Sequence, residues 1–69
     1  MGIKDLILSK FSSEAAFARH LGWSRQRLNK ITNFSKGPTV QEINDIAIGL
    51  GESASDVYLI FLRQKSPNG

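Results

Sequence analysis

The middle of the chain concentrates side chains that can hydrogen-bond to the edges of DNA bases. Arginine can bond guanine through two donors, and glutamine or asparagine can bond adenine in the same bidentate way. If residues 25–33 form a helix with about 100° per residue, one arc of about 140° holds five polar side chains. They are Arg25, Gln26, Asn29, Lys30 and Asn33. Leu28 and Ile31 share the opposite side, so such a helix packs with one face and donates hydrogen bonds with the other.

The turn before this segment bears on two interpretations of it. The ordinary interpretation is an amphipathic surface helix with a solvated polar face. However, Gly22, Trp23 and Ser24 form a short turn in which Ser24 can cap the following helix. Long donor side chains at the start of a helix, behind such a turn, are what reading a DNA groove requires. We therefore favour the base-reading helix.

Apolar residues recur every three or four positions without strict alternation, which predicts an all-α fold. Cap and stop residues divide the chain into five helices. They run over about 3–10, from Ser12 or Ser13 to Gly22, from Ser24 to about 33, from Thr39 to Gly51, and from Ser53 to about Arg63. Thr39 and Glu42 have the spacing of a capping box, and Val40 is expected on the buried face of the fourth helix. We expect one domain over residues 1–65 and a disordered tail at 66–69.

Size and composition exclude several classes of function. The 69 residues allow one small core and include no cysteine, so neither a disulfide nor a thiolate metal site is available. His20 is the single histidine, and no glycine-rich phosphate loop or paired-carboxylate pocket is visible. We therefore expect no enzyme activity, no cofactor and no metal. The longest apolar run, residues 57–62, is too short to span a bilayer, and no secretion signature is visible, so we expect a cytoplasmic protein.

Charge is unevenly distributed along the chain. Residues 10–36 carry six lysines and arginines against Glu14 alone, a net charge of +5. Residues 37–62 carry four carboxylates and no basic residue, a net charge of −4. Simple solvation of a small surface could account for these charges. A positive end around the expected reading helix also suits a polyanionic partner.

Several spaced groups of residues between positions 13 and 51 form one pattern. They are SEAAFARHLGWS at 13–24, NKITN at 29–33, GPT at 37–39, and Ile43, Ala47 and Leu50. The pattern resembles the phage-repressor helix-turn-helix family, which includes the lambda repressor, Cro and XRE-type regulators. This resemblance implies a compact five-helix repressor-like domain that binds operator DNA, usually as a dimer, with its third helix in the major groove.

The resemblance also implies roles for individual residues, with double-stranded DNA as the partner. The base-reading side chains would be Arg25, Gln26 and Asn29. Contacts to phosphate or to the rim of the groove would come from Ser24, Arg27, Lys30, Asn33 and Lys36.

Two residues depart from the family pattern. The family commonly has glutamine at the position of Glu14, where a carboxylate repels phosphate. Glu14 could pair with Arg25, which would either orient Arg25 or hold it away from DNA. Phe34 stands where the family often has glycine. This aromatic ring either packs onto the core or presents a contact surface.

The last helix is unusually apolar. Residues 57–62 are all apolar or aromatic, so their side chains point in every direction around the helix. A central helix with both flanks covered is one interpretation. In a domain this small we instead expect one flank to remain exposed as an association surface. Its expected residues are Ile48, Tyr58, Leu59 and Leu62.

Two hypotheses for function follow. The first is a small transcriptional regulator that binds operator DNA as a homodimer through its fifth helix. The second is an antirepressor or modulator of the phage type that binds another helix-turn-helix regulator as a heteromer rather than binding DNA. Glu14, Phe34 and the apolar fifth helix motivate the second hypothesis, and the fold by itself does not separate the two.

Overall fold

Five α-helices form the part of the chain that the computed structural model describes, which is the backbone of residues 2–65 and the side chains of residues 2–63. They are α1 (Ile3–Lys10), α2 (Glu14–Leu21), α3 (Arg25–Thr32), α4 (Val40–Leu50) and α5 (Ala54–Lys65). No strand occurs within these residues, which confirms the all-α prediction. The tail expected at 66–69 lies outside the described residues.

Local capping chemistry sets the helix boundaries. Ser13 and Ser24 accept hydrogen bonds at 3.1 Å from the backbone N–H groups of Ala16 and Arg27, and these bonds begin α2 and α3. Gly22 and Gly51 end α2 and α4 with φ values of 77° and 71°, a left-handed conformation that glycine adopts without penalty. The predicted starts and stops are therefore confirmed at these positions.

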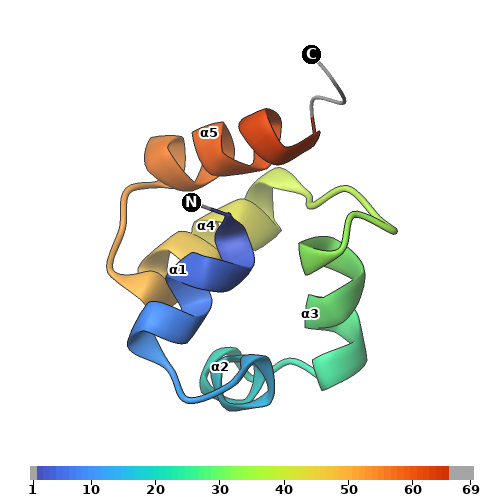
Figure 1. Ribbon diagram of the computed structural model, residues 1–69, viewed down its shortest axis with the longest axis vertical. Helices are drawn as coiled ribbons and strands as arrows, with labels where there is room; N and C mark the ends of the chain where they lie inside the picture. The colour runs from blue at the N-terminus through green and yellow to red at the C-terminus, as the bar shows by residue number, and fades with distance from the viewer. Residues whose placement is uncertain (1, 66–69) are drawn as a thin grey trace.

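The helices surround one core, and the radius of gyration is 11.0 Å. In Figure 1, α4 and α1 occupy the middle, α5 crosses the top, and α3 runs up the right side. Below them α2 is seen nearly end-on, so α2 and α3 cross at a steep angle. The core side chains come from all five helices and include Ile7, Phe17, Leu28, Ile46 and Val57. The helix that carries the polar arc is thus tied to the same core as every other element.

One expectation for the core is wrong. Val40 is predicted on the buried face of α4, but it is 83% exposed. A helical side chain covers the turn that precedes its own Cα. Val40 is the first residue of α4, so its side chain extends past the end of the helix and adds to the surface instead.

A glycine brings α2 and α4 together. A Cβ atom at Gly49 would lie 2.8 Å from Leu21 Cδ2 and 2.9 Å from Phe17 Cε1. Phe17 is fully buried and has little room to move. The absence of a side chain at Gly49 therefore sets how closely α2, and with it the turn into α3, approaches the core.

None of the helices in residues 2–65 is long and apolar enough to cross a membrane.

Candidate nucleic-acid interface

The orientation of α3 is the first requirement of a base-reading helix. Leu28 and Ile31 are completely buried. On the outer side, Arg25, Gln26 and Lys30 are exposed, as is Asn33 just beyond the helix end. The expected orientation, with apolar anchors beneath and polar side chains outward, is confirmed.

The exposed arc of α3 is not uniform. Asn29, predicted as a base reader, is partly buried. On the helical wheel it lies between Arg25 and Gln26, near the direction of Thr32, which is 2% exposed and contacts α2. Gln26 and Lys30 lie farther from α2 on the wheel and are exposed.

Ser24 combines a structural role with its predicted one. Its Oγ accepts the N–H of Arg27 at 3.1 Å, which uses the oxygen as an acceptor. The hydroxyl proton is not used by this bond, so it can still be donated to a phosphate oxygen. The capping role is confirmed, and the phosphate contact stays a prediction.

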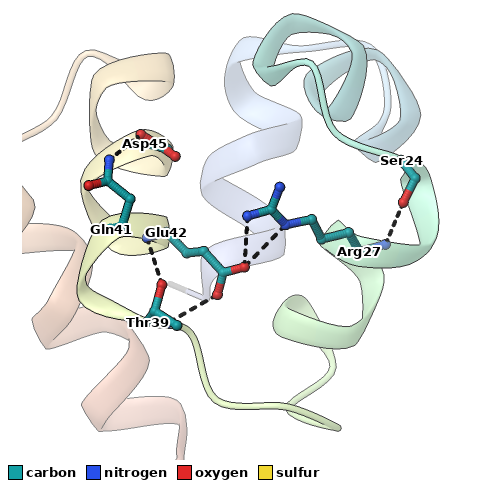
Figure 2. A network of polar contacts seen from close by, with 6 residues as sticks. All are labelled: Ser24, Arg27, Thr39, Gln41, Glu42 and Asp45. Atoms are coloured by element: carbon teal, nitrogen blue, oxygen red, sulfur yellow. Dashed lines mark hydrogen bonds and ion pairs between the residues drawn. The ribbon is translucent and has the colours of Figure 1, made fainter.

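The position of Arg27 differs from that of a free phosphate-binding side chain. Its Nε donates to Glu42 Oε2 at 3.1 Å, and its Nη2 lies 3.1 Å from the same oxygen. The guanidinium carbon also lies 4.1 Å from the centre of the Trp23 ring. Arg27 is thus held between α4 and the turn at residues 22–24 (Figure 2). It lies on the flank of α3 that faces α4, where the buried carboxylate of Glu42 requires a cation.

Glu42 is the anchor of this network. Its side chain is only 5% exposed, yet both carboxylate oxygens have partners. Oε1 accepts the backbone N–H of Thr39 at 3.0 Å, and Thr39 Oγ1 accepts the N–H of Glu42 at 3.1 Å, so the predicted capping box is confirmed. The bond from the Thr39 backbone lowers the pKa of Glu42 most, and the hydrogen bond from Arg27 and the charges of Lys36 and Arg27 lower it further. Burial opposes these effects only in part, so Glu42 is ionised at neutral pH.

Glu14 holds the other flank of α3. Its Oε1 accepts the hydroxyl of Thr32 at 2.9 Å, across the contact between α2 and α3. The sequence suggests a pairing with Arg25, but the described partner of Glu14 is Thr32. Thr32 is 2% exposed and its hydroxyl requires an acceptor. The carboxylate is therefore used to fix the helix, and Arg25 is free of it.

Phe34 lies at the start of the loop that follows α3. Its φ is 63°, the one left-handed conformation of a non-glycine residue in the described chain. Its ring packs edge-to-face on Phe61 of α5, with centroids 6.2 Å apart, and remains 37% exposed. Of the two roles suggested for Phe34, the ring fulfils both: it packs against the core and contributes to the surface. The same loop carries the exposed Lys36, whose N–H bonds the Lys30 carbonyl at 3.0 Å.

Positive charge gathers on the surface of α2, α3 and the following loop. Arg19, Arg25, Lys30 and Lys36 are exposed there, and no ion pair within residues 2–63 holds any of them. Lys10, the other lysine of residues 10–36, forms an ion pair with Glu52 at 3.3 Å. Two of these unpaired cations, Arg25 and Lys30, lie on the polar arc of α3, and this concentration of positive charge favours an anionic partner.

The expected association surface is only partly brought together. Tyr58, Leu59 and Leu62 are each about half-exposed along one side of α5, so the interpretation of α5 as a helix with both flanks covered is wrong for the monomer. Ile48 is 76% exposed but borders a different hollow, between α2 and α4, together with His20 and Asp45. We call the side formed by Tyr58, Leu59 and Leu62 the α5 stripe.

An apolar hollow of about 230 Å³ borders one side of the α5 stripe. Its lining residues are Phe34, Gly37, Pro38, Ile43, Tyr58, Phe61 and Leu62. Tyr58 also borders a second apolar hollow beside the exposed Val40. Phe34 and Val40, which the sequence did not assign to this surface, thus extend it toward the loop after α3.

Metal binding finds no support in residues 2–63, which contain no group of three or more His, Cys, Asp or Glu side chains able to hold an ion. His20 instead lies beside aromatic rings, with centroid distances of 5.2 Å to Phe11 and 6.5 Å to Phe17.

Comparisons of the chain with protein-family models, with curated proteins and with solved structures found no match. The function of the chain must therefore be inferred from its own residues and their geometry.

Proposed function

We propose that the chain is a small transcriptional regulator of the repressor-like helix-turn-helix class, which binds operator DNA with α3 in the major groove. In this proposal α2, the turn at residues 22–24 and α3 form the helix-turn-helix. Arg25, Gln26 and Asn29 read base edges. Phosphates and the rim of the groove are contacted by Ser24, Arg27, Lys30, Asn33 and Lys36.

The observation that carries this proposal is the position of α3. Its apolar residues Leu28 and Ile31 are fully buried, while its donor side chains are exposed. Both flanks of the helix are fixed by polar contacts, from Arg27 to Glu42 and from Thr32 to Glu14. A helix held in this way presents its donors in a defined geometry, which base recognition requires.

The proposed active form is a homodimer that uses the α5 stripe. Asp56 and Arg63 border the same groove beside Leu59, one on each side of it along α5. In an antiparallel pair of α5 helices centred near Leu59, Asp56 of each copy faces Arg63 of the other, as a twofold interface requires. Two α3 helices would then reach successive major grooves with half-site centres about 34–36 Å apart.

A binding experiment tests the proposal. The chain is titrated into mixed-sequence and selected duplexes at several salt concentrations, with its molar mass measured by light scattering. Gln26→Ala should weaken binding to a selected site by about 1–3 kcal/mol, while Lys36→Ala should weaken all sequences alike and flatten the salt slope. Equal losses on selected and mixed duplexes for both variants would end the assignment of α3 as a reader.

A second candidate function is that of an antirepressor or modulator, which binds another helix-turn-helix regulator. The observation that favours it is the apolar surface formed by the α5 stripe with Phe34 and Val40, all exposed by more than a third. A monomer that ignores DNA at low salt, yet forms a complex with a purified helix-turn-helix regulator, would support this function over the first.

A further inference from the structure

The guanidinium of Arg27 uses only part of its hydrogen-bonding capacity inside the molecule. Nε and Nη2 both approach Glu42 Oε2. The third nitrogen, Nη1, points away from the carboxylate in Figure 2, and no partner for it occurs among the described side chains. The side chain of Arg27 is 46% exposed, so Arg27 lies at the surface, where a ligand can approach it.

Glu42 and Trp23 together fix where the Nη1 edge of the guanidinium lies. Glu42 is held from its other oxygen by the Thr39 backbone, so it cannot follow Arg27 if Arg27 moves. The Trp23 ring lies under the guanidinium plane at 4.1 Å. An arginine normally loses much of its rotamer freedom when it binds a ligand. Here that freedom is already restricted in the free protein, which favours binding through preorganisation.

We propose that Glu42 is a positioning residue for DNA binding, which presets Arg27 so that its Nη1 edge donates to one backbone phosphate. This inference rests on the proposed function, because it specifies how one phosphate contact of that interface is made. Arg27 serves two acceptors at once, the buried carboxylate on one edge and the phosphate on the other. The planar guanidinium of Arg27 has donors on both edges and can serve two acceptors, whereas a lysine ammonium is a single point of charge.

The proposal predicts an effect opposite to that of simple electrostatics. Glu42→Gln removes a negative charge from the protein, so long-range attraction to DNA should increase. A glutamine has one acceptor oxygen, which cannot serve both Thr39 and Arg27 as the carboxylate does. Arg27 is then no longer held, and binding to DNA should weaken. The sign of the change therefore separates positioning from charge.

The experiment measures binding of the variants to a mixed-sequence duplex between about 50 and 200 mM salt. We expect Glu42→Gln to weaken binding about three- to tenfold and to reduce the salt slope by about one. The matched control is Asp45→Asn, which removes the same charge from the same helix but from a residue bonded to Gln41 (Figure 2). It should bind as tightly as the unmodified chain or slightly more tightly.

A double variant tests whether Glu42 acts through Arg27. Glu42→Gln should cause no further loss of affinity in the Arg27→Gln background, because there is no guanidinium left to position. Tighter or unchanged binding of Glu42→Gln with an unchanged salt slope overturns the proposal, and so does a full additional loss in the double variant.

Failure of the proposal is distinguishable from failure of the proposed function. If Lys36→Ala flattens the salt slope while Glu42→Gln does not, only the role of Glu42 is overturned. If the unmodified chain shows no salt-dependent binding, DNA binding itself is overturned. If the Glu42→Gln variant does not fold, the Arg27→Lys variant tests the proposal instead, because it keeps the net charge. A salt slope lower by about one supports the proposal, and an unchanged slope overturns it.

Discussion

Phe34 combines an unfavourable backbone conformation with a favourable ring contact, and the two can be separated by substitution. Its φ of 63° is one that an L-residue adopts only at a cost, whereas its ring packs on Phe61 with centroids 6.2 Å apart. Phe34→Ala removes the ring and keeps the strained backbone. Phe34→Gly removes the ring and relieves the strain, because glycine adopts the left-handed conformation freely.

The magnitudes follow from burial. A phenylalanine buries about 150–250 Å² when fully covered, and Phe34 is 37% exposed. Covering about two thirds of that area stabilises the fold by at most about 2.5–4 kcal/mol, with about 0.5–1.5 kcal/mol more for the ring pair. The left-handed conformation costs about 1–2 kcal/mol. Phe34→Ala keeps that cost and loses only the ring, so it should lower the free energy of unfolding by at most about 3–5.5 kcal/mol.

Phe34→Gly should be less harmful than Phe34→Ala. Relief of strain is partly offset by the greater flexibility of glycine in the unfolded chain, which costs about 0.5–1 kcal/mol. The glycine variant should therefore be more stable than the alanine variant by about 0.5–1 kcal/mol. Urea unfolding followed by circular dichroism and by the emission of Trp23 measures both variants. In a thermal scan each kcal/mol should shift Tm by about 4–8 °C. If alanine is as stable as glycine, position 34 is not left-handed in solution, and if alanine matches phenylalanine, the ring contributes nothing.

Three further predictions concern charge. Glu14→Gln keeps an acceptor for Thr32 and removes a carboxylate from the side proposed to face DNA, so DNA affinity at low salt should rise about two- to fivefold and the gain should fade at high salt; an unchanged affinity would place Glu14 away from the phosphates. Because the pKa of Glu42 in the folded chain is lower than the ordinary value of an unfolded glutamate, its stabilising effect is fully present above that ordinary value and is lost as pH falls through the folded pKa. The gap in unfolding free energy between the unmodified chain and Glu42→Gln should therefore be largest near neutral pH and should shrink in acid, and urea melts that give a constant gap from pH 7 to pH 3 contradict this. Asp56→Arg and Arg63→Asp should each dissociate the proposed dimer, and the double variant should restore it in light scattering; a double variant that stays monomeric rules out the antiparallel register.

Short-range features of the fold were predictable from sequence because their physics is local. Ser24 as a cap and Gly22 as a left-handed stop act within a few residues, so spacing alone reveals them. The same holds for the capping box of Thr39 and Glu42. The buried anchors of α3 follow from helical periodicity, which explains why the orientation of its polar arc agreed with expectation.

The contacts that fix α3 were not predictable, because they join residues far apart in sequence. Arg27 and Glu42 are 15 residues apart, and Glu14 and Thr32 are 18 apart. The capping box accounts for one oxygen of Glu42 and gives no sign that the other binds α3. A polar residue on the apolar side of the wheel, such as Thr32, was the available signal that a buried partner was needed.

The loop of residues 33–39 connects the two candidate surfaces, so they should not act independently. It carries Asn33 and Lys36, which are proposed to contact DNA. At its start Phe34 is packed on Phe61 and borders the hollow that Tyr58 and Leu62 of the α5 stripe also line. A partner that covers this part of α5 restricts the loop, whether that partner is a second copy or another regulator. Ordering the loop in advance reduces the entropy that DNA binding must overcome, so occupation of the α5 stripe and DNA affinity should rise together.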